Sequence, residues 1–208
     1  MKDSYLNAQN ITKLWQKKEI SISFNLSKGS SLALLGSSGA GKTTILKMIA
    51  GLIKIDSGKL FLDGKDISNI PAGKRDIGMV FQDYALFPHL TVEDNIAYGL
   101  FCLGFSKKDA RMKVQKWISL FELSHIATHK PNEISGGEKQ RTSLARSLAT
   151  GNNIILFDEP LSALNTSLRL KLQEELKQHQ LSLGYTAIYV THDEDEAKVL
   201  ANNIIYIT

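Results

Sequence analysis

The sequence has little that would cross-link a fold or hold it in a membrane. Its 208 residues contain a single cysteine, Cys102, which excludes an intramolecular disulfide framework and argues against a cysteine-ligated metal site. No apolar run reaches the roughly 18 residues that suggest a membrane span, and the polar amino end has no signal-peptide block. Internal repeats and low-complexity linkers are also lacking. We therefore expect a soluble, cytoplasmic chain that would reach a membrane only through a partner.

What is present is ordinary globular composition with a mild basic excess. Hydrophobic residues make up 43% and charged residues 22% of the chain, which excludes a disordered tail protein. The length suffices for one sizeable domain or two small ones. A net charge of +4 favours an anionic partner, but it does not choose among nucleotide, nucleic acid and lipid headgroup.

Short apolar runs alternate with longer helical patterns, as in an α/β layered domain. A helix is predicted over residues 42–50, with Gly51 placed to end it. Residues 92–123 have a helical pattern that we interpret as an insertion in the core. Residues 6–26 and the turn signals around Gly58 and Gly64 predict a small antiparallel sheet. Buried strands are expected at residues 31–35, 77–81, 153–157, 186–190 and 204–207.

A glycine-rich loop follows the first of these buried strands and opens the predicted helix. Its outer glycines let backbone N–H groups turn inward around a phosphate, and the helix N-terminus adds partial positive charge. Lys42 would reach the β and γ oxygens, the Thr43 hydroxyl would bind Mg²⁺, and Thr44 could add a hydrogen bond. The loop consists of Gly36, Ser37, Ser38, Gly39, Ala40, Gly41, Lys42 and Thr43.

A second feature that could bind phosphate lies further along the chain. Ser135 followed by Glu138 is a capping box, so a purely structural helix cap is one interpretation. Gly136 and Gly137 leave the hydroxyl and the amides open, so an anion could also bind there. The residues alone leave both interpretations open.

Acidic and imidazole side chains follow two of the expected strands. Asp158 and Glu159 end the strand at 153–157, where one carboxylate could bind Mg²⁺ and the other could polarise a water molecule. His192 follows the strand at 186–190, also at a carboxyl end, where ligands of parallel sheets gather. Taken singly, an acidic pair at a strand end is structural as often as functional, and a lone histidine is more often structural.

Together these stretches resemble an ATP-binding cassette (ABC) ATPase, and the resemblance covers nearly the whole chain. Besides the phosphate loop, four stretches match motifs of the family. Residues 134–138 match the signature and residues 155–160 match the second nucleotide motif. Residues 80–82 match the glutamine loop and residues 191–193 match the histidine switch. The motifs follow one another in the family order. The implied fold is α/β: a P-loop NTPase core with a mostly parallel sheet, an antiparallel β-subdomain and a helical insertion.

The resemblance implies ATP and Mg²⁺ as cofactors and a role for each matching residue. Trp15 would stack on adenine, although a core position for this residue stays open. Gln82 would sense Mg²⁺ and the attacking water, and Asp158 would contact Mg²⁺. Glu159 would act as general base, with His192 on the γ-phosphate. Lys42 and Gln82 complete the implied catalytic set.

The family also implies partners. Ser135, Gly136 and Gly137 would contact the ATP of a second copy, or of a paired ABC subunit, in a head-to-tail dimer. Residues 75–92 resemble bacterial importer ATPases for polyamines, sulfate, ferric iron, thiamine or sugars. A membrane permease and an extracytoplasmic solute-binding protein would then complete the complex on the inner face of the membrane, and no nucleic acid is expected. An apolar patch for the permease is predicted from Tyr84, Leu86, Phe87, Pro88 and Leu90, unless these residues pack under the helical insertion.

Two departures from the family pattern stand out. Asn165 occupies a position where the family usually has Asp, which predicts reduced turnover. The chain stops at Thr208, so we expect one cassette over 1–208 without a C-terminal regulatory domain. Residues 1–82 and 150–208 would form the core, and residues 88–149 the helical subdomain.

Alternative functions within and outside the family differ in clear features. A non-transport ABC ATPase would usually carry coiled-coil insertions or tandem cassettes, and a P-loop kinase would not explain Ser135 to Gly137. A nucleotide-gated binding module with little catalysis is disfavoured by Glu159 and modestly favoured by Asn165.

Overall fold

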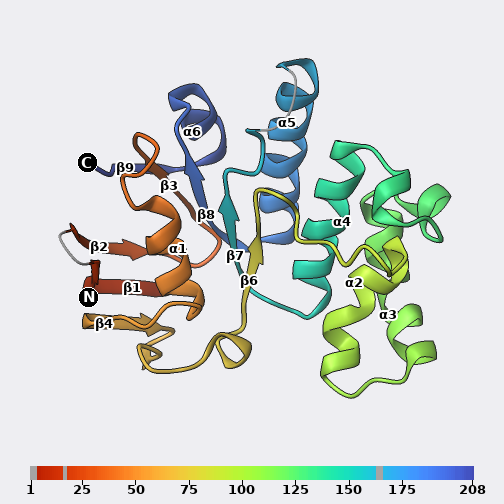
Figure 1. Cartoon of the computed structure of the whole chain (residues 1–208), viewed down its shortest axis with the longest axis horizontal. Coiled ribbons are helices and arrows are strands. Elements are labelled where there is room, and N and C mark those ends of the chain that lie inside the picture. Colours follow the sequence, from red (N-terminus) through yellow and green to blue (C-terminus); the bar gives the residue numbers. More distant parts are fainter. Residues whose placement is uncertain (1–3, 16–17, 163–165) are drawn as a thin grey trace.

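A five-stranded parallel sheet crosses the middle of the molecule (Figure 1). The computed structural model describes residues 4–15, 18–162 and 166–208. The strand order is β6-β7-β8-β3-β9, and every pair in it is parallel. All five buried strands were predicted, with ends that differ by a residue or two. Their bounds are Ile77–Val80 for β6, Ile154–Asp158 for β7, Thr186–Thr191 for β8, Ser31–Leu35 for β3 and Asn203–Tyr206 for β9.

The amino-terminal part forms the predicted antiparallel sheet, with the order β2-β1-β4-β5. A bulge interrupts β1 between Ala8 and Ile11, where Asn10 adopts a φ of 47°. Gly58 lies against this bulge, and a Cβ on it would stand 2.1 Å from the Asn10 carbonyl oxygen, so only glycine fits. The strands are β1 (Leu6–Trp15), β2 (Lys18–Leu26), β4 (Ser57–Leu62) and β5 (Lys65–Asp66).

The helical pattern predicted over residues 92–123 forms two main helices. The break falls at residues 103–106, where Ser106 caps the second helix by accepting from the Asp109 N–H at 3.2 Å. None of the described helices is both long and apolar enough to cross a membrane. The main helices are α1 (Lys42–Ala50), α2 (Val92–Cys102), α3 (Lys107–Leu120), α4 (Gly136–Ala149), α5 (Thr166–Leu183) and α6 (Glu194–Leu200).

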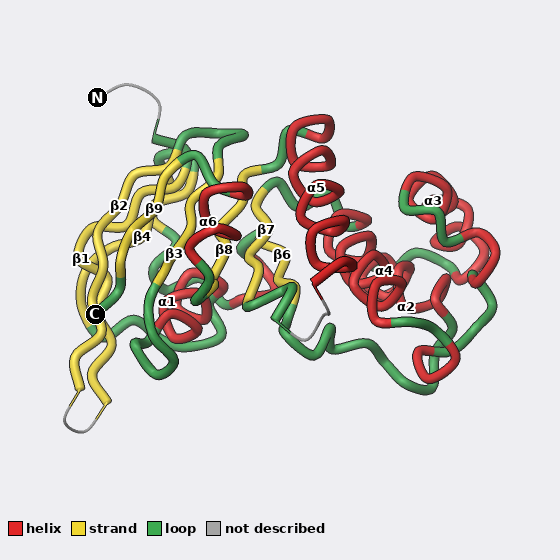
Figure 2. Tube along the Cα trace, turned by 90° about the horizontal axis from the view of Figure 1, so that it is seen from above, coloured by secondary structure: helices red, strands yellow, loops and turns green. Residues whose placement is uncertain are grey.

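The parallel sheet separates two hydrophobic cores, because alternate side chains of each strand point to opposite faces. In β7, Ile154 and Leu156 pack toward α1 and the antiparallel sheet, whereas Ile155 and Phe157 pack toward α2, α4 and α5. Figure 2 shows the strands on one side and most helices on the other. Since all five strands run in one direction, their carboxyl ends share one edge, and the loops that leave this edge carry the site.

Candidate functional site

The glycine-rich loop connects β3 to α1, as predicted. Lys42 is buried in it, with Nζ donating to the carbonyl oxygens of Gly36 at 2.7 Å and Ser37 at 2.9 Å. A Cβ on Gly36 would stand 2.3 Å from the Ile207 carbonyl oxygen, so the loop needs glycine there. Gly41 supplies no side-chain cap to α1, which leaves the N–H groups of its first turn for an anionic ligand.

Thr43 and Asp158 meet across the site, although 115 positions separate them in the sequence. The Thr43 hydroxyl donates to Oδ1 of Asp158 at 2.7 Å. Burial raises the pKa of the Asp158 carboxyl, and the Thr43 hydrogen bond opposes that shift. A hydroxyl beside a carboxylate is a hard-oxygen donor pair of the kind that binds Mg²⁺ together with phosphate oxygens and water. The residues therefore fit the ion that the sequence predicts.

Glu159 and His192 are also brought together, one from the end of β7 and one from the end of β8. Oε2 of Glu159 lies 3.7 Å from Nδ1 of His192. The backbone of Glu159 is left-handed, with a φ of 47°, and its N–H donates to the Val190 carbonyl oxygen at 3.0 Å. A left-handed backbone is uncommon for glutamate, and this hydrogen bond holds the backbone of Glu159 at the end of β8.

Gln82, two residues after the end of β6, reaches the segment that follows Glu159. Its Nε2 donates to the hydroxyl of Ser162 at 3.1 Å, and that hydroxyl also lies 3.1 Å from the Glu159 carbonyl oxygen. Ser162 was not predicted as a site residue, because a serine in a loop gives no signal of its own. Asn165 lies outside the described residues.

Trp15 stands at the end of β1 with 48% of its surface exposed, which excludes the core position left open by the sequence. Its strand partner is Lys18, and the Lys18 ammonium donates to the Gly39 carbonyl oxygen at 2.8 Å. The Lys13 ammonium lies 5.5 Å from the centre of the indole ring. An exposed aromatic ring is thus tied to the rim of the phosphate loop.

The signature stretch does not join this group of residues within one chain. Its capping box is confirmed: the Ser135 side chain accepts from the Glu138 N–H, and the Glu138 carboxylate accepts from the Ser135 N–H. In both ribbon views α4, which Ser135 caps, and α1 lie on opposite sides of β7 and β6 (Figures 1 and 2). Ser135, Gly136 and Gly137 thus stand apart from the phosphate loop.

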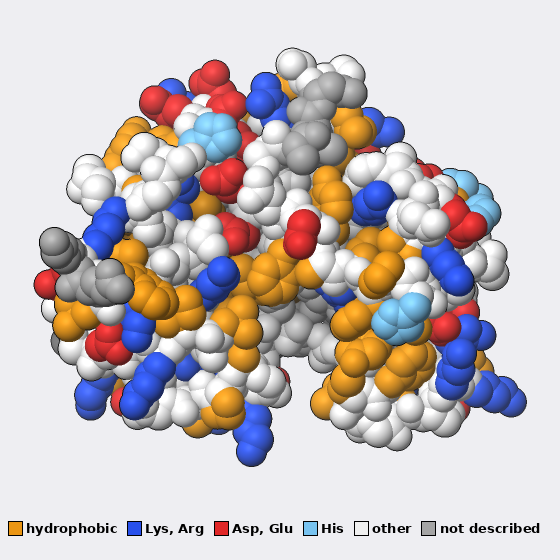
Figure 3. Space-filling view, viewed as in Figure 1, with side chains coloured by type: hydrophobic (Ala, Val, Ile, Leu, Met, Phe, Trp, Pro, Cys, Tyr) orange, Lys and Arg blue, Asp and Glu red, His pale blue; other side chains and the backbone are white. Residues whose placement is uncertain are grey.

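The predicted apolar patch after Gln82 is only partly a surface. Tyr84 is buried, which is the packing alternative, whereas Pro88 is exposed and Phe87 is half-buried. The rings of Phe87 and Tyr98 pack against each other with their centres 4.2 Å apart and their planes tilted by 39°, beside a cavity of about 450 Å³. A hollow separates the two lobes low in the space-filling view (Figure 3). Other residues that line the cavity include Leu52, Met79, Phe81, Ala85 and Arg146.

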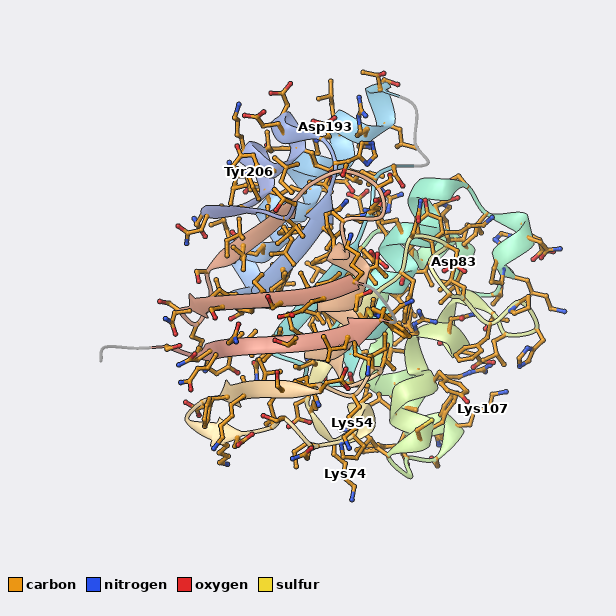
Figure 4. All side chains as sticks on the ribbon, turned by 60° about the vertical axis from the view of Figure 1, so that its left-hand side comes forward. Lys54, Lys74, Asp83, Lys107, Asp193 and Tyr206 are labelled. Atoms are coloured by element: carbon orange, nitrogen blue, oxygen red, sulfur yellow. The ribbon has the colours of Figure 1, made fainter. Side chains whose placement is uncertain are left out.

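A buried carboxyl that the sequence does not predict lies near the site. Glu196, on α6, is 3% exposed, and burial raises its pKa to about 7. The Thr191 hydroxyl opposes the shift, Asp193 and Glu159 add to it, and Arg169 opposes it. Asp193 caps α6 and is labelled in Figure 4. An acidic residue in a helix of charged neighbours gives no sequence signal of burial.

Replacing Glu196 by Gln should therefore stabilise the fold at alkaline pH and change little under acidic conditions. The folded chain binds this proton more tightly than the unfolded chain, so stability falls as pH rises from about 4.5 to about 7. By linkage the ionised carboxyl costs about 3 kcal/mol above that window. Urea unfolding at several pH values measures this, with Glu194→Gln as an exposed control on the same helix. Equal stability of variant and parent above pH 7 would contradict it.

The phosphate loop between a buried strand and a helix, with its threonine on a strand-end carboxylate, defines a nucleotide-binding domain of the P-loop class. A family model described as ABC transporter matches residues 20–162, and the chain belongs to this family. The resemblance drawn from the motifs and the predicted fold class are both confirmed.

Individual relatives agree with this assignment. The chain is 45% identical over 184 residues to the Fe(3+) ions import ATP-binding protein FbpC of Brucella abortus, which covers 88% of this chain and 52% of that protein. It is 44% identical over 206 residues to the spermidine/putrescine import ATP-binding protein PotA of Hahella chejuensis, covering 98% and 56%. The chain spans about half the length of the curated relatives it matches.

A solved structure shares the fold over nearly its whole length. It is a dimeric, post-hydrolysis state of the ATP-binding cassette MJ0796 bound to ADP and Pi. The TM-score is 0.83 at 31% identity, and the match covers 98% of this chain and 94% of that one.

Proposed function

We propose that the chain is the ATP-binding and ATP-hydrolysing part of an ABC importer. The observation that carries this proposal is the 2.7 Å hydrogen bond between Thr43 and Asp158, which joins the phosphate loop to the end of β7. Beside it, Glu159 and His192 stand 3.7 Å apart at the same sheet edge. The names of the FbpC and PotA relatives support the import function.

The chain's own residues bind and orient the nucleotide. Trp15 offers a half-exposed ring for the adenine base. Lys42 and the amides of residues 36–44, which include Thr44, hold the phosphates at the start of α1. Thr43 and Asp158 hold Mg²⁺, with Gln82 close to the same edge, and the ion neutralises charge on the phosphates when bound.

Glu159 takes the proton of the attacking water, and His192 hydrogen-bonds the γ-phosphate. The 3.0 Å bond from the Glu159 N–H to the Val190 carbonyl oxygen keeps the backbone of Glu159 at the sheet edge. Gln82, through Ser162, links the water-activating segment to the loop after β6. A movement of that loop is therefore transmitted to the catalytic edge through the hydrogen bond between Gln82 and Ser162.

Ser135, Gly136 and Gly137 act on the nucleotide of a second copy in a head-to-tail dimer. Support comes from the position of α4, which lies across β7 and β6 from α1 (Figure 1), and from the dimeric cassette that shares the fold. In an isologous two-fold interface, the phosphate loop of each copy lies against the start of α4 of the other copy, so the dimer contains two such contacts. ATP then bridges the copies, and hydrolysis releases them.

The cavity of about 450 Å³ beside Phe87 and Tyr98 would receive a cytoplasmic helix of a membrane permease. It opens next to the segment that Gln82 begins, so a permease helix seated there would contact the sensor loop. In this assignment the chain lies on the inner face of the membrane with an extracytoplasmic solute-binding protein in the complex. Residues 1–82 and 150–208 form the nucleotide core, and residues 88–149 form the helical subdomain.

Two measurements test the proposal. The purified chain should release phosphate from ATP in a saturable, Mg²⁺-dependent manner, and permease subunits should co-purify with it from detergent-solubilised membranes. A chain that binds no ATP would refute the catalytic part. Recovery of soluble proteins alone would refute the importer part and leave the ATPase assignment standing.

A further inference from the structure

Both hydrogen-bond donors of Ser135 are already paired within the chain. Its hydroxyl and its backbone N–H both donate to one carboxylate oxygen, Oε2 of Glu138, at 2.7 Å each. A hydroxyl carries a single proton, so Ser135 cannot donate to another acceptor while it keeps this bond. Any phosphate that reaches this helix end has to compete with the Glu138 carboxylate.

The other oxygen of the same carboxylate faces a histidine. Nε2 of His125 lies 3.2 Å from Oε1 of Glu138. The two Ser135 hydrogen bonds lower the pKa of the Glu138 carboxyl, and His125 lowers it further. The carboxylate is therefore shared by the signature serine on one side and an imidazole on the other.

A negative side chain at this position opposes an anionic ligand. The start of α4 attracts anions through its free N–H groups and its dipole. The Glu138 carboxylate lies in the first turn of α4 and already interacts with this positive end of the helix. A protonated His125 imidazole, 3.2 Å from Oε1, offsets the carboxylate charge, whereas a neutral imidazole leaves the full negative charge.

We propose that Glu138 and His125 are positioning residues which set how readily Ser135 is released to the nucleotide phosphate of a second copy. This inference rests on the proposed function, since it assumes that ATP bridges two chains through α4. Glu138 weakens the pairing by holding Ser135 and by repelling phosphate. A protonated His125 relieves both effects.

The test measures dimerisation of the full chain with Mg²⁺ and the non-hydrolysable ATP analogue adenylyl imidodiphosphate, by sedimentation. Glu138→Gln keeps the shape of the cap and removes its charge, and it should tighten pairing about two- to fivefold at about pH 8. His125→Gln should weaken pairing by a similar factor at about pH 6 and leave it unchanged at about pH 8. The double variant should behave like Glu138→Gln alone at both pH values.

His129→Gln is the matched control, because His129 is exposed and no side-chain bond of it is found among the described residues. It should leave pairing unchanged at both pH values. Dimers of equal affinity in the parent, Glu138→Gln and His125→Gln would overturn the inference and leave the proposed function intact. If no chain binds the analogue in equilibrium dialysis, the proposed function itself fails.

Discussion

A Glu159→Gln variant is expected to lose about 10²- to 10⁴-fold of its ATP hydrolysis rate, the contribution of a positioned general base. A Gln side chain has the same length as Glu, and its backbone can adopt the same left-handed conformation. The bond from its N–H to the Val190 carbonyl oxygen should therefore persist. The amide cannot take a proton from water. ATP binding should be retained, because Lys42, Thr43 and Asp158 are untouched, and ATP-bridged dimers should accumulate.

The measurement is phosphate release under single-turnover conditions, with ATP affinity measured in parallel. Glu174→Gln is the control: it makes the same chemical change at an exposed position on α5. A Glu159→Gln rate within about twofold of the parent would remove Glu159 from the role of base, because even the low end of a general-base contribution is larger. Loss of ATP affinity along with the rate would instead indicate that Glu159 acts in binding.

Much of this site was predictable because its chemistry is local in sequence. The phosphate loop needs a strand, a glycine turn and a helix start in immediate succession, and residues 31–50 supply all three. Asp158, Glu159 and His192 could be placed at one edge because parallel strands end on the same side of a sheet. The five strands of the parallel sheet were predicted from apolar runs, and only the ends of these strands differ from the prediction.

The features that escaped prediction depend on contacts between distant segments. Ser162 matters because Gln82 reaches it from 80 positions away, and nothing in its own neighbourhood shows that. The burial of Glu196 and the contact of His125 with Glu138 depend on which way a side chain turns once the helices have packed. The sequence pattern was interpreted only as helical over residues 92–123, so it did not place the break between α2 and α3.

Arg75 holds together the far end of the phosphate-loop helix, although its position gives no catalytic signal. It is 3% exposed. Its Nη1 donates to the carbonyl oxygens of Met48 and Ile49 at 2.8 Å each, in the last turn of α1. Nε donates to Ile70 at 2.6 Å, and Nη2 donates to Ser68 at 3.0 Å. One guanidinium thus satisfies the carbonyl end of α1 and ties it to the segment before β6.

Replacing Arg75 by Met should lower the free energy of unfolding by about 3–5 kcal/mol, because Met fills similar space and leaves these buried carbonyl groups without their charged donor. Urea unfolding followed by circular dichroism measures the change. Arg75→Lys has one ammonium in place of the planar guanidinium, and its free energy of unfolding should fall by less than that of the Met variant. This variant keeps the test informative if Arg75→Met does not fold. Lys74→Met, at the exposed neighbouring position, should stay within about 0.5 kcal/mol of the parent. A similarly small effect of Arg75→Met would show that water or local rearrangement satisfies the carbonyl end of α1 without Arg75.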